Sequence, residues 1–265
     1  MDFSDYARLC RAEPEGHFAD IGDIRMHYLR EGSGPSLLLL HGGLGAAGGW
    51  RPVIDALSGF DIIAPDSRGQ GRSTDGDGPM TYGRMAADMV GLLDHLGIEQ
   101  AHVAGHSDGG CLALHLLVDY PDRVVTATLA GTPLHHDDYR EGAVNWMRKG
   151  FDKMRAGDDP GGFKGTYDAL NPNPERWPVV MEKLAATWLS QPMFADQVLG
   201  VVTVPVLVIV NSGDGFLPRG AFERAANLFP MADSVEIEGT HINIVEHPED
   251  TAQAIEAFTR RHPAA

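Results

Sequence analysis

Three residues of types that cooperate in nucleophilic catalysis occur in the order Ser107, Asp214 and His241. A serine hydroxyl is a weak nucleophile at neutral pH, so it needs a nearby base, and a histidine base needs a carboxylate that fixes its tautomer. Ser107 is the centre of Gly105-His106-Ser107-Asp108-Gly109, a G-x-S-x-G pattern typical of a sharp turn from a strand into a helix. The flanking glycines let the strand and the helix approach closely, so the turn is expected to hold the hydroxyl out into a cleft.

Each of these three residues is expected at the end of a strand. They follow apolar runs that predict strands at residues 101–104, 204–210 and 233–238, respectively. In open parallel sheets, ligands bind at the carboxyl ends of the strands. The three side chains are therefore expected to converge at one edge of the sheet.

Apolar runs that alternate with helix-like segments predict an α/β fold with a doubly wound sheet. The first two predicted strands, joined at Gly22-Asp23, indicate an antiparallel edge, whereas continuous apolar runs such as Ser36–Leu40 favour strands covered on both faces. The predicted strands are His17–Ile21, Ile24–Leu29, Ser36–Leu40, Phe60–Ala64, Ala101–Ala104, Val124–Leu129, Val204–Val210 and Asp233–Glu238. Helices are predicted over Trp50–Leu57, Met80–Leu96, the apolar segment behind Ser107 and Pro248–Arg260.

The alternation of strands and helices stops after the sixth predicted strand. Residues 134–200 have helical spacing, several aromatic and methionine side chains, and no convincing strand. We therefore predict a core of residues 1–133 and 201–265, with residues 134–200 inserted as a helical cap over a cleft.

Composition limits the class of partner. A chain of 265 residues with 43% apolar residues can bury one large core. A formal charge of −16 and a pI near 5.0 argue against nucleic acids and anionic membranes as partners. The first residues lack a basic segment followed by a long apolar one, and no apolar run is long enough to span a membrane, so a cytoplasmic location is expected. The partner is expected to be a small molecule; the oligomeric state is not indicated.

Five motifs in order resemble those of the α/β-hydrolase superfamily, over roughly Ile24–Phe258. The motifs are HGGLG at 41–45, DSRGQGRS at 66–73, GHSDGG at 105–110, SGDGFLP at 212–218 and GTHINIVEHPE at 239–249. The resemblance implies a mostly parallel eight-stranded sheet flanked by helices, with Ser107 as nucleophile, His241 as base and Asp214 as its acid. It also implies an oxyanion hole formed by the backbone amides of Gly43 and Asp108, and no metal or organic cofactor.

Such a site is expected to hydrolyse a small, largely apolar carboxylic ester or lactone by two-step acyl transfer. Residues expected to contact the substrate are Leu44, Trp146, Trp188, Phe216 and Ile242. Hydrolysis of carbon–carbon bonds in ring-fission products, or haloperoxidase or perhydrolase chemistry, remain alternatives because they use the same triad. Relatives that cleave carbon–carbon bonds commonly have methionine after the serine, and Asp108 departs from that pattern.

Other interpretations of single motifs stay open. The acid could follow the preceding strand, as Asp137 or Asp138, and the cluster from His135 to Asp138 is also compatible with a metal site, although a solvated hinge is favoured. The segment Gly43–Gly48 has the form G-x-G-x-x-G, and with Asp66 it would suit a dinucleotide-binding oxidoreductase, a distant alternative. A hydrolase-like receptor that binds a small ligand with little turnover is a third class.

Overall fold

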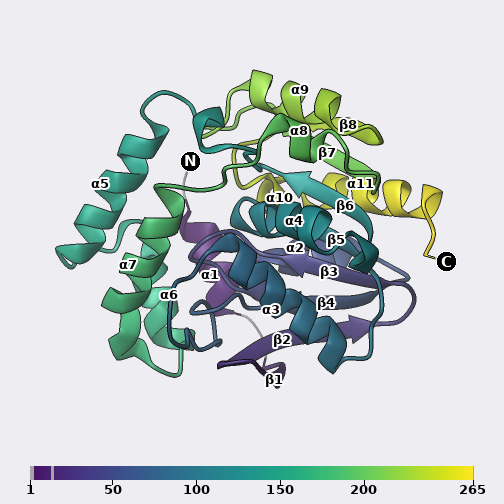
Figure 1. Cartoon of the computed structure of the whole chain (residues 1–265). Helices are drawn as coiled ribbons and strands as arrows, with labels where there is room; N and C mark the ends of the chain where they lie inside the picture. Colours follow the sequence, from purple (N-terminus) through teal and green to yellow (C-terminus); the bar gives the residue numbers. More distant parts are fainter. Residues whose placement is uncertain (1–2, 13–14, 265) are drawn as a thin grey trace.

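In the computed structural model, which describes residues 3–12 and 15–264, eight strands form one sheet in the order β1-β2-β4-β3-β5-β6-β7-β8 (Figure 1). The strands are β1 (His17–Ile21), β2 (Ile24–Gly32), β3 (Ser36–Leu40), β4 (Asp61–Pro65), β5 (Ala101–His106), β6 (Val124–Ala130), β7 (Val206–Asn211) and β8 (Ala232–Ile237). The β1–β2 and β2–β4 pairs are antiparallel, and every other pair is parallel. The predicted fold class is confirmed, including the antiparallel edge.

Helices cover both faces of the sheet. Three helices pack on one face with a common apolar core, namely α3 (Tyr82–His95), α4 (Asp108–Asp119) and α9 (Arg219–Leu228). The opposite face is covered mainly by α2 (Arg51–Ala56) and α11 (Pro248–Arg261), which form a second apolar core (Figure 1). The strands β3, β5 and β7 are almost entirely buried between these two layers, which explains their unbroken apolar sequences.

The segment between β6 and β7, called the helical insertion below, contains α5 (Ala143–Arg155), α6 (Phe163–Leu170), α7 (Trp177–Trp188) and α8 (Asp196–Leu199). Its helices α5 to α7 lie together at one end of the sheet (Figure 1). They share an apolar cluster that also includes Leu44 and Met80 from outside the insertion. Many aromatic and methionine side chains of the insertion therefore pack against one another, and part of the cluster rests on the loops at the sheet edge.

Polar contacts fix α6 and α7 to the loop between β4 and α3. The buried carboxylate of Asp75 accepts hydrogen bonds from Arg176 Nη2 and Lys183 Nζ, both at 2.6 Å. Asn171 Nδ2 donates to two carbonyl oxygens of the same loop, and Thr187 Oγ1 donates to Met80 O at 2.7 Å. Burial alone would raise the pKa of Asp75, but the hydrogen bonds and charges of Arg176 and Lys183 outweigh it and lower the pKa below its ordinary value.

We expect Asp75→Asn to lower the free energy of unfolding by about 2 kcal/mol at pH 7, the scale of lost hydrogen bonds to a charged group. Because the pKa of Asp75 is lowered in the folded chain, its ion pairs stabilise the fold above the unfolded pKa of about 3.9. That stabilisation is lost as the pH falls through the lower folded value. Urea unfolding of both proteins at pH 7 and at stepwise lower pH tests this, with exposed Asp77→Asn as the control. A difference that stays the same at every pH, down to the lowest at which both proteins fold, would contradict it.

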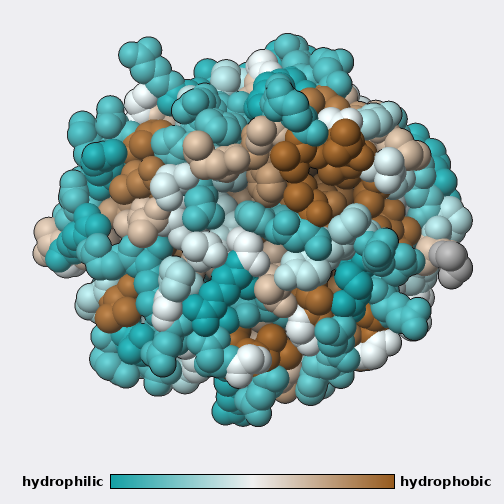
Figure 2. Space-filling model, in the orientation of Figure 1, coloured by the Kyte–Doolittle hydropathy of each residue, from teal (hydrophilic) through white to brown (hydrophobic). Residues whose placement is uncertain are grey.

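The surface is mostly polar, with an apolar patch over α8 and the neighbouring parts of β7 and β8 (Figure 2), where Val198, Val201 and Met231 are exposed. Cys10 and Cys111 are both buried. Within the described ranges, none of the helices combines the length and apolar character needed to cross a bilayer.

Candidate active site

The turn between β5 and α4 holds Ser107 in a strained conformation. Ser107 has φ 54° and ψ −116°, in the region that residues with a side chain rarely adopt. The turn is tight because a Cβ on Gly109 would lie 2.0 Å from Leu40 O, and one on Gly105 would lie 2.3 Å from Gly109 O. The prediction of a sharp strand-to-helix turn, with glycines where backbone segments meet, agrees with this geometry.

Asp214 and His241 lie beside this turn, after β7 and β8, respectively. His241 Nε2 is 2.9 Å from Ser107 Oγ, and His241 Nδ1 is 2.8 Å from Asp214 Oδ2. The other oxygen of Asp214 accepts hydrogen bonds from the amides of Phe216 and Leu217 at 2.7 and 3.0 Å. The structure therefore brings together three side chains from distant parts of the chain: Ser107 and His241 are 134 residues apart in the sequence.

Asp214 is held as a carboxylate. Burial, the largest influence, would raise its pKa, but the His241 imidazole and the two backbone amides together lower the pKa below its ordinary value. An ionised Asp214 must accept the proton on His241 Nδ1, which leaves Nε2 unprotonated and facing Ser107 Oγ when the imidazole is neutral. In this state His241 is positioned to accept the hydroxyl proton.

His106 supports the loop that carries His241. Its Nε2 lies 2.7 Å from the backbone carbonyl oxygen of His241, and since a carbonyl only accepts, Nε2 carries a proton. Burial, reinforced by the nearby His241, lowers the pKa of His106 to about 3, so the ring is neutral. Because His106 directly precedes Ser107 in the chain, this hydrogen bond links the serine turn to the loop of His241.

The two amides predicted to bind the oxyanion belong to Asp108, which directly follows the serine, and to Gly43 in the His41–Gly45 loop. Asp108 is the first residue of α4, where backbone N–H groups have no acceptor within the helix. A Cβ on Gly42 would lie 3.4 Å from Ser107 Cβ, so the His41–Gly45 loop passes directly beside the serine. The next residue of the loop, Leu44, has φ 58° and is held by a 2.6 Å hydrogen bond from its amide to Gln70 Oε1. Backbone with positive φ is thus present both at Ser107 and at Leu44, directly after Gly43.

We expect Gly43→Ala to reduce kcat for any hydrolysed substrate by about 100-fold, the scale of losing one aligned amide donor. The added Cβ would lie 2.0 Å from the Trp188 ring and 2.6 Å from Asp108 Oδ2, so the loop must shift. Steady-state kinetics of this variant and of Gly220→Ala, where a Cβ meets nothing within 4 Å, provide the comparison. Unchanged kcat in Gly43→Ala would contradict a role for this amide.

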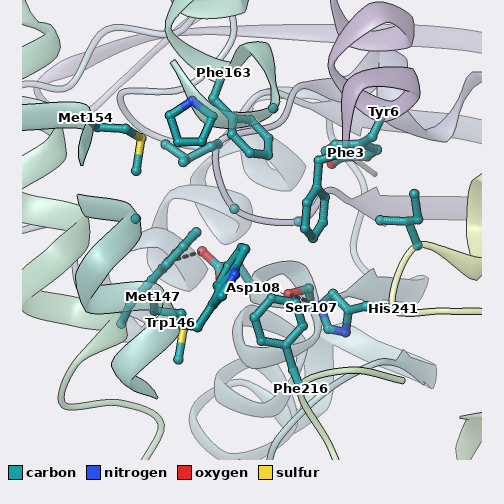
Figure 3. Close-up of a pocket in the computed structure, with 18 of the residues that line it drawn as sticks. Phe3, Tyr6, Ser107, Asp108, Trp146, Met147, Met154, Phe163, Phe216 and His241 are labelled. Atoms are coloured by element: carbon teal, nitrogen blue, oxygen red, sulfur yellow. Dashed lines mark hydrogen bonds between the residues drawn. The ribbon is translucent and has the colours of Figure 1, made fainter. Parts of the chain in front are cut away.

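A largely apolar cavity of about 340 Å³ opens above Ser107 (Figure 3). All five residues predicted to contact a substrate lie in its lining: Leu44, Trp146, Trp188, Phe216 and Ile242. Trp146 is 54% exposed and packs at the edge of the cavity against Phe216, with ring centroids 5.2 Å apart. Phe216 in turn packs edge-on against the His241 ring.

Part of the cavity wall comes from an N-terminal helix that was not predicted from the sequence. Phe3 and Tyr6, at the start of α1 (Ser4–Arg11), project into the cavity lining (Figure 3). Helix α1 packs against the short 3-10 helix Ala47–Trp50 of the core and against α6, so it touches both the core and the insertion. Its signal was the spacing of Phe3, Tyr6, Ala7 and Cys10, which is that of one helix face.

The contacts of the Asp108 side chain with the cavity and with Trp188 were not predicted from the sequence. The residue is 7% exposed and lines the cavity. Its Oδ1 accepts a hydrogen bond from the Tyr82 hydroxyl at 2.9 Å, and its Oδ2 accepts one from Trp188 Nε1 at 2.6 Å. Burial raises the pKa of Asp108 to about 6, although both hydrogen bonds act in the opposite direction.

The residues on which the alternative interpretations depend make contacts in the structure that do not involve His241 or a metal site. The Asp138 carboxylate accepts from the amides of Leu134 and His135 and pairs with Arg224, whereas His241 contacts Asp214. No group of three or more histidine, cysteine or acidic side chains arranged to hold a metal was found in residues 3–12 and 15–264.

Asp66, the acid of the dinucleotide alternative, is fully buried and accepts from two backbone amides, while its Oδ2 contacts His27 Nδ1. It is not accessible to a ribose. Arg68, in the same motif, is buried in a bidentate pair with Asp88, which is a structural role.

Part of the chain, residues 35–164, matches the family model described as alpha/beta hydrolase fold. Carboxylesterase YbfK of Bacillus subtilis (strain 168) is 31% identical over 269 residues, covering 93% of this chain and 88% of the esterase. The crystal structure of that carboxylesterase matches with a TM-score of 0.73 at 26% identity, covering 97% of this chain and 95% of the other.

Two further relatives are not named as esterases. The magnesium-chelatase 30 kDa subunit of Rhodobacter capsulatus is 34% identical over 239 residues, covering 79% of this chain and 81% of that protein. The putative carbamate hydrolase RutD of Azorhizobium caulinodans is 42% identical over 113 residues, covering 42% of this chain and 43% of that protein. The chain spans less than half the length of this and two other curated relatives that it matches.

Proposed function

The chain belongs to the α/β-hydrolase fold family, and from this premise we propose that it is a serine hydrolase of small, largely apolar carboxylic esters or lactones. The observation that carries the proposal is the continuous contact from Asp214 through His241 to Ser107, with donor–acceptor distances of 2.8 and 2.9 Å. This contact ends at the floor of an apolar cavity large enough for a small substrate.

In the proposed mechanism, His241 accepts the hydroxyl proton of Ser107 as Oγ attacks the carbonyl carbon. The amides of Gly43 and Asp108 donate to the oxyanion, each contributing on the order of 3 kcal/mol. His241 then protonates the leaving alcohol, and an acyl group remains on Ser107. Water, deprotonated by the same histidine, attacks the acyl-enzyme and releases the acid, with Asp214 stabilising the imidazolium in both steps. The reaction as proposed uses no metal or organic cofactor.

We propose that the helical insertion acts as a cap that shapes the substrate site. Trp146, Met147, Met154 and Trp188 of the insertion line the cavity together with Phe216 and Ile242 of the core. These side chains favour an apolar acyl or alcohol group, since their burial by substrate removes apolar surface from water. The cavity volume of about 340 Å³ favours short groups over long acyl chains.

The test is a panel of purified substrates: p-nitrophenyl esters from acetate to octanoate, a simple lactone and a vinylogous 1,5-diketone. We expect kcat/KM to be highest for a short ester or lactone and to fall as the acyl chain outgrows the cavity. Cleavage of the diketone without any hydrolysis of esters or lactones would overturn the proposal in favour of carbon–carbon bond hydrolysis. Formation of a peracid from acetate and peroxide, again without ester hydrolysis, would favour a perhydrolase.

A carbamate ester is the second candidate substrate. It is supported by the 42% identity to a protein named putative carbamate hydrolase, over residues that make up 42% of this chain. A p-nitrophenyl carbamate added to the same panel separates the two candidates. Faster turnover of the carbamate than of the carboxylic ester with the same alkyl group would favour it.

A further inference from the structure

The carboxylate of Asp108 in the cavity lining is a feature that ester hydrolysis alone does not require. Its observed partners are two neutral donors, the hydroxyl of Tyr82 and the indole N–H of Trp188. A Cβ on Gly43 would lie 2.6 Å from Asp108 Oδ2, so the carboxylate lies against the backbone of the His41–Gly45 loop. Figure 3 shows this side chain facing the cavity next to Ser107.

Keeping an acid at this position is costly in two ways. Burial penalises its charged form, which raises the pKa of Asp108 to about 6. A negative charge near the Gly43 amide also opposes the oxyanion that this amide is proposed to bind. A carboxylate accepts about four hydrogen bonds, and Tyr82 and Trp188 supply one to each oxygen. A donor group of the substrate would satisfy a remaining lone pair and reduce the repulsion.

The arrangement around Ser107 indicates which part of the substrate meets Asp108. Asp108 and His241 lie on opposite sides of Ser107 in Figure 3. His241 must reach the leaving group to protonate it, so the leaving group faces the histidine. The acyl group then extends toward the side of Asp108 and Met147 (Figure 3), where Trp188 donates to the Asp108 carboxylate.

We propose that Asp108 is a specificity-determining acceptor that binds a hydroxyl or N–H donor on the acyl part of the substrate, close to the carbonyl carbon. The inference rests on the proposed function and names its substrate class: acyl groups with a polar hydrogen near the carbonyl, in an otherwise apolar chain. Tyr82 and Trp188 hold the carboxylate in place for this contact. The high pKa that burial gives the Tyr82 phenol keeps it neutral, so it remains a donor.

The test uses three esters of similar size, assayed at pH 8, where Asp108 is ionised. They are p-nitrophenyl butyrate, p-nitrophenyl 3-hydroxybutyrate and p-nitrophenyl 3-methoxybutyrate; the methoxy ester keeps the oxygen and lacks the donor. For the unaltered protein we expect kcat/KM for the hydroxy ester to exceed that for the methoxy ester by roughly 10- to 100-fold, the scale of a hydrogen bond to a charged group. In Asp108→Ala the ratio should fall to near one, and in Asp108→Asn to an intermediate value.

A purely structural role of Asp108 gives a different result. If the carboxylate only anchors Trp188, then Asp108→Ala and Trp188→Phe change kcat/KM for all three esters by the same factor, and the hydroxy-to-methoxy ratio stays unchanged. That outcome overturns the inference and leaves the proposed function intact. Absence of Ser107-dependent hydrolysis of all three esters overturns the proposed function and this inference with it.

Discussion

Ser107→Ala is expected to lower kcat for the best ester of the panel by about 10⁴- to 10⁶-fold, as for other serine nucleophiles. The hydroxyl is the atom that attacks, and no other hydroxyl is within hydrogen-bond distance of His241 Nε2 in the described part of the chain. Activity should be measured in single-turnover as well as steady-state experiments. Mass spectrometry of the unaltered protein with a slow ester should show an acyl group on the peptide containing Ser107, and the variant should show none.

The matched control is Ser212→Ala, because Ser212 is an exposed serine close to Asp214 in the sequence. This variant should keep nearly all the activity, and both variants should unfold at similar urea concentrations, since Ser107 Oγ contributes little buried apolar surface. Residual activity of Ser107→Ala above about one per cent, with a folded protein, would show that another group is the nucleophile.

Asp214→Asn is expected to lower kcat by about 10⁴-fold, with little change in the fold. The amide of asparagine can present an N–H to His241 Nδ1, which favours the tautomer that carries its proton on Nε2 and cannot accept one from Ser107. Burial of Asp214 and its lowered pKa indicate that the native group is ionised throughout the neutral range. Measurement of kcat between pH 6 and 9 should show that the loss is not recovered at any pH.

Asp138→Asn tests the alternative position for the acid. It removes charge from the Arg224 pair, and we expect lower stability with most of the activity retained at a temperature where the variant is folded. A larger loss of kcat in Asp138→Asn than in Asp214→Asn would reverse the assignment of the acid. Thermal unfolding of both variants separates loss of fold from loss of chemistry.

The sheet could be predicted from the sequence because its strands are either continuously apolar or alternate at an edge. The predicted bounds differ from the observed ones by one to a few residues: β2 continues to Gly32 because residues 28–32 pair with β4, and β5 continues through His106 into the turn. Helix α9 was not predicted, because its residues show no long apolar run; only Ala221, Phe222 and Ala225 are buried. Helix α3 begins at Tyr82 rather than Met80, since the Thr81 hydroxyl caps its first turn.

At the site, the sequence predicted the residues whose position follows from chain topology. Ser107, Asp214 and His241 all follow parallel strands, and the ends of such strands meet at one edge of the sheet. The wall contributed by α1 and the contact of Trp188 with Asp108 depend on how separate helices pack, and no local pattern encodes that packing. The positions of Phe3 and of the Asp108 carboxylate in the cavity lining could therefore not be predicted from the sequence.

The four tryptophans divide into two groups by location. Trp50 and Trp177 are buried in apolar clusters, whereas Trp146 and Trp188 line the cavity, and the indole N–H of Trp188 is bound to a carboxylate. Intrinsic fluorescence of the chain should consequently respond to whatever occupies the cavity, because two of its four emitters would touch the occupant. Titration monitored by emission can therefore rank compounds that are never turned over, including products and inhibitors, without a chromogenic leaving group.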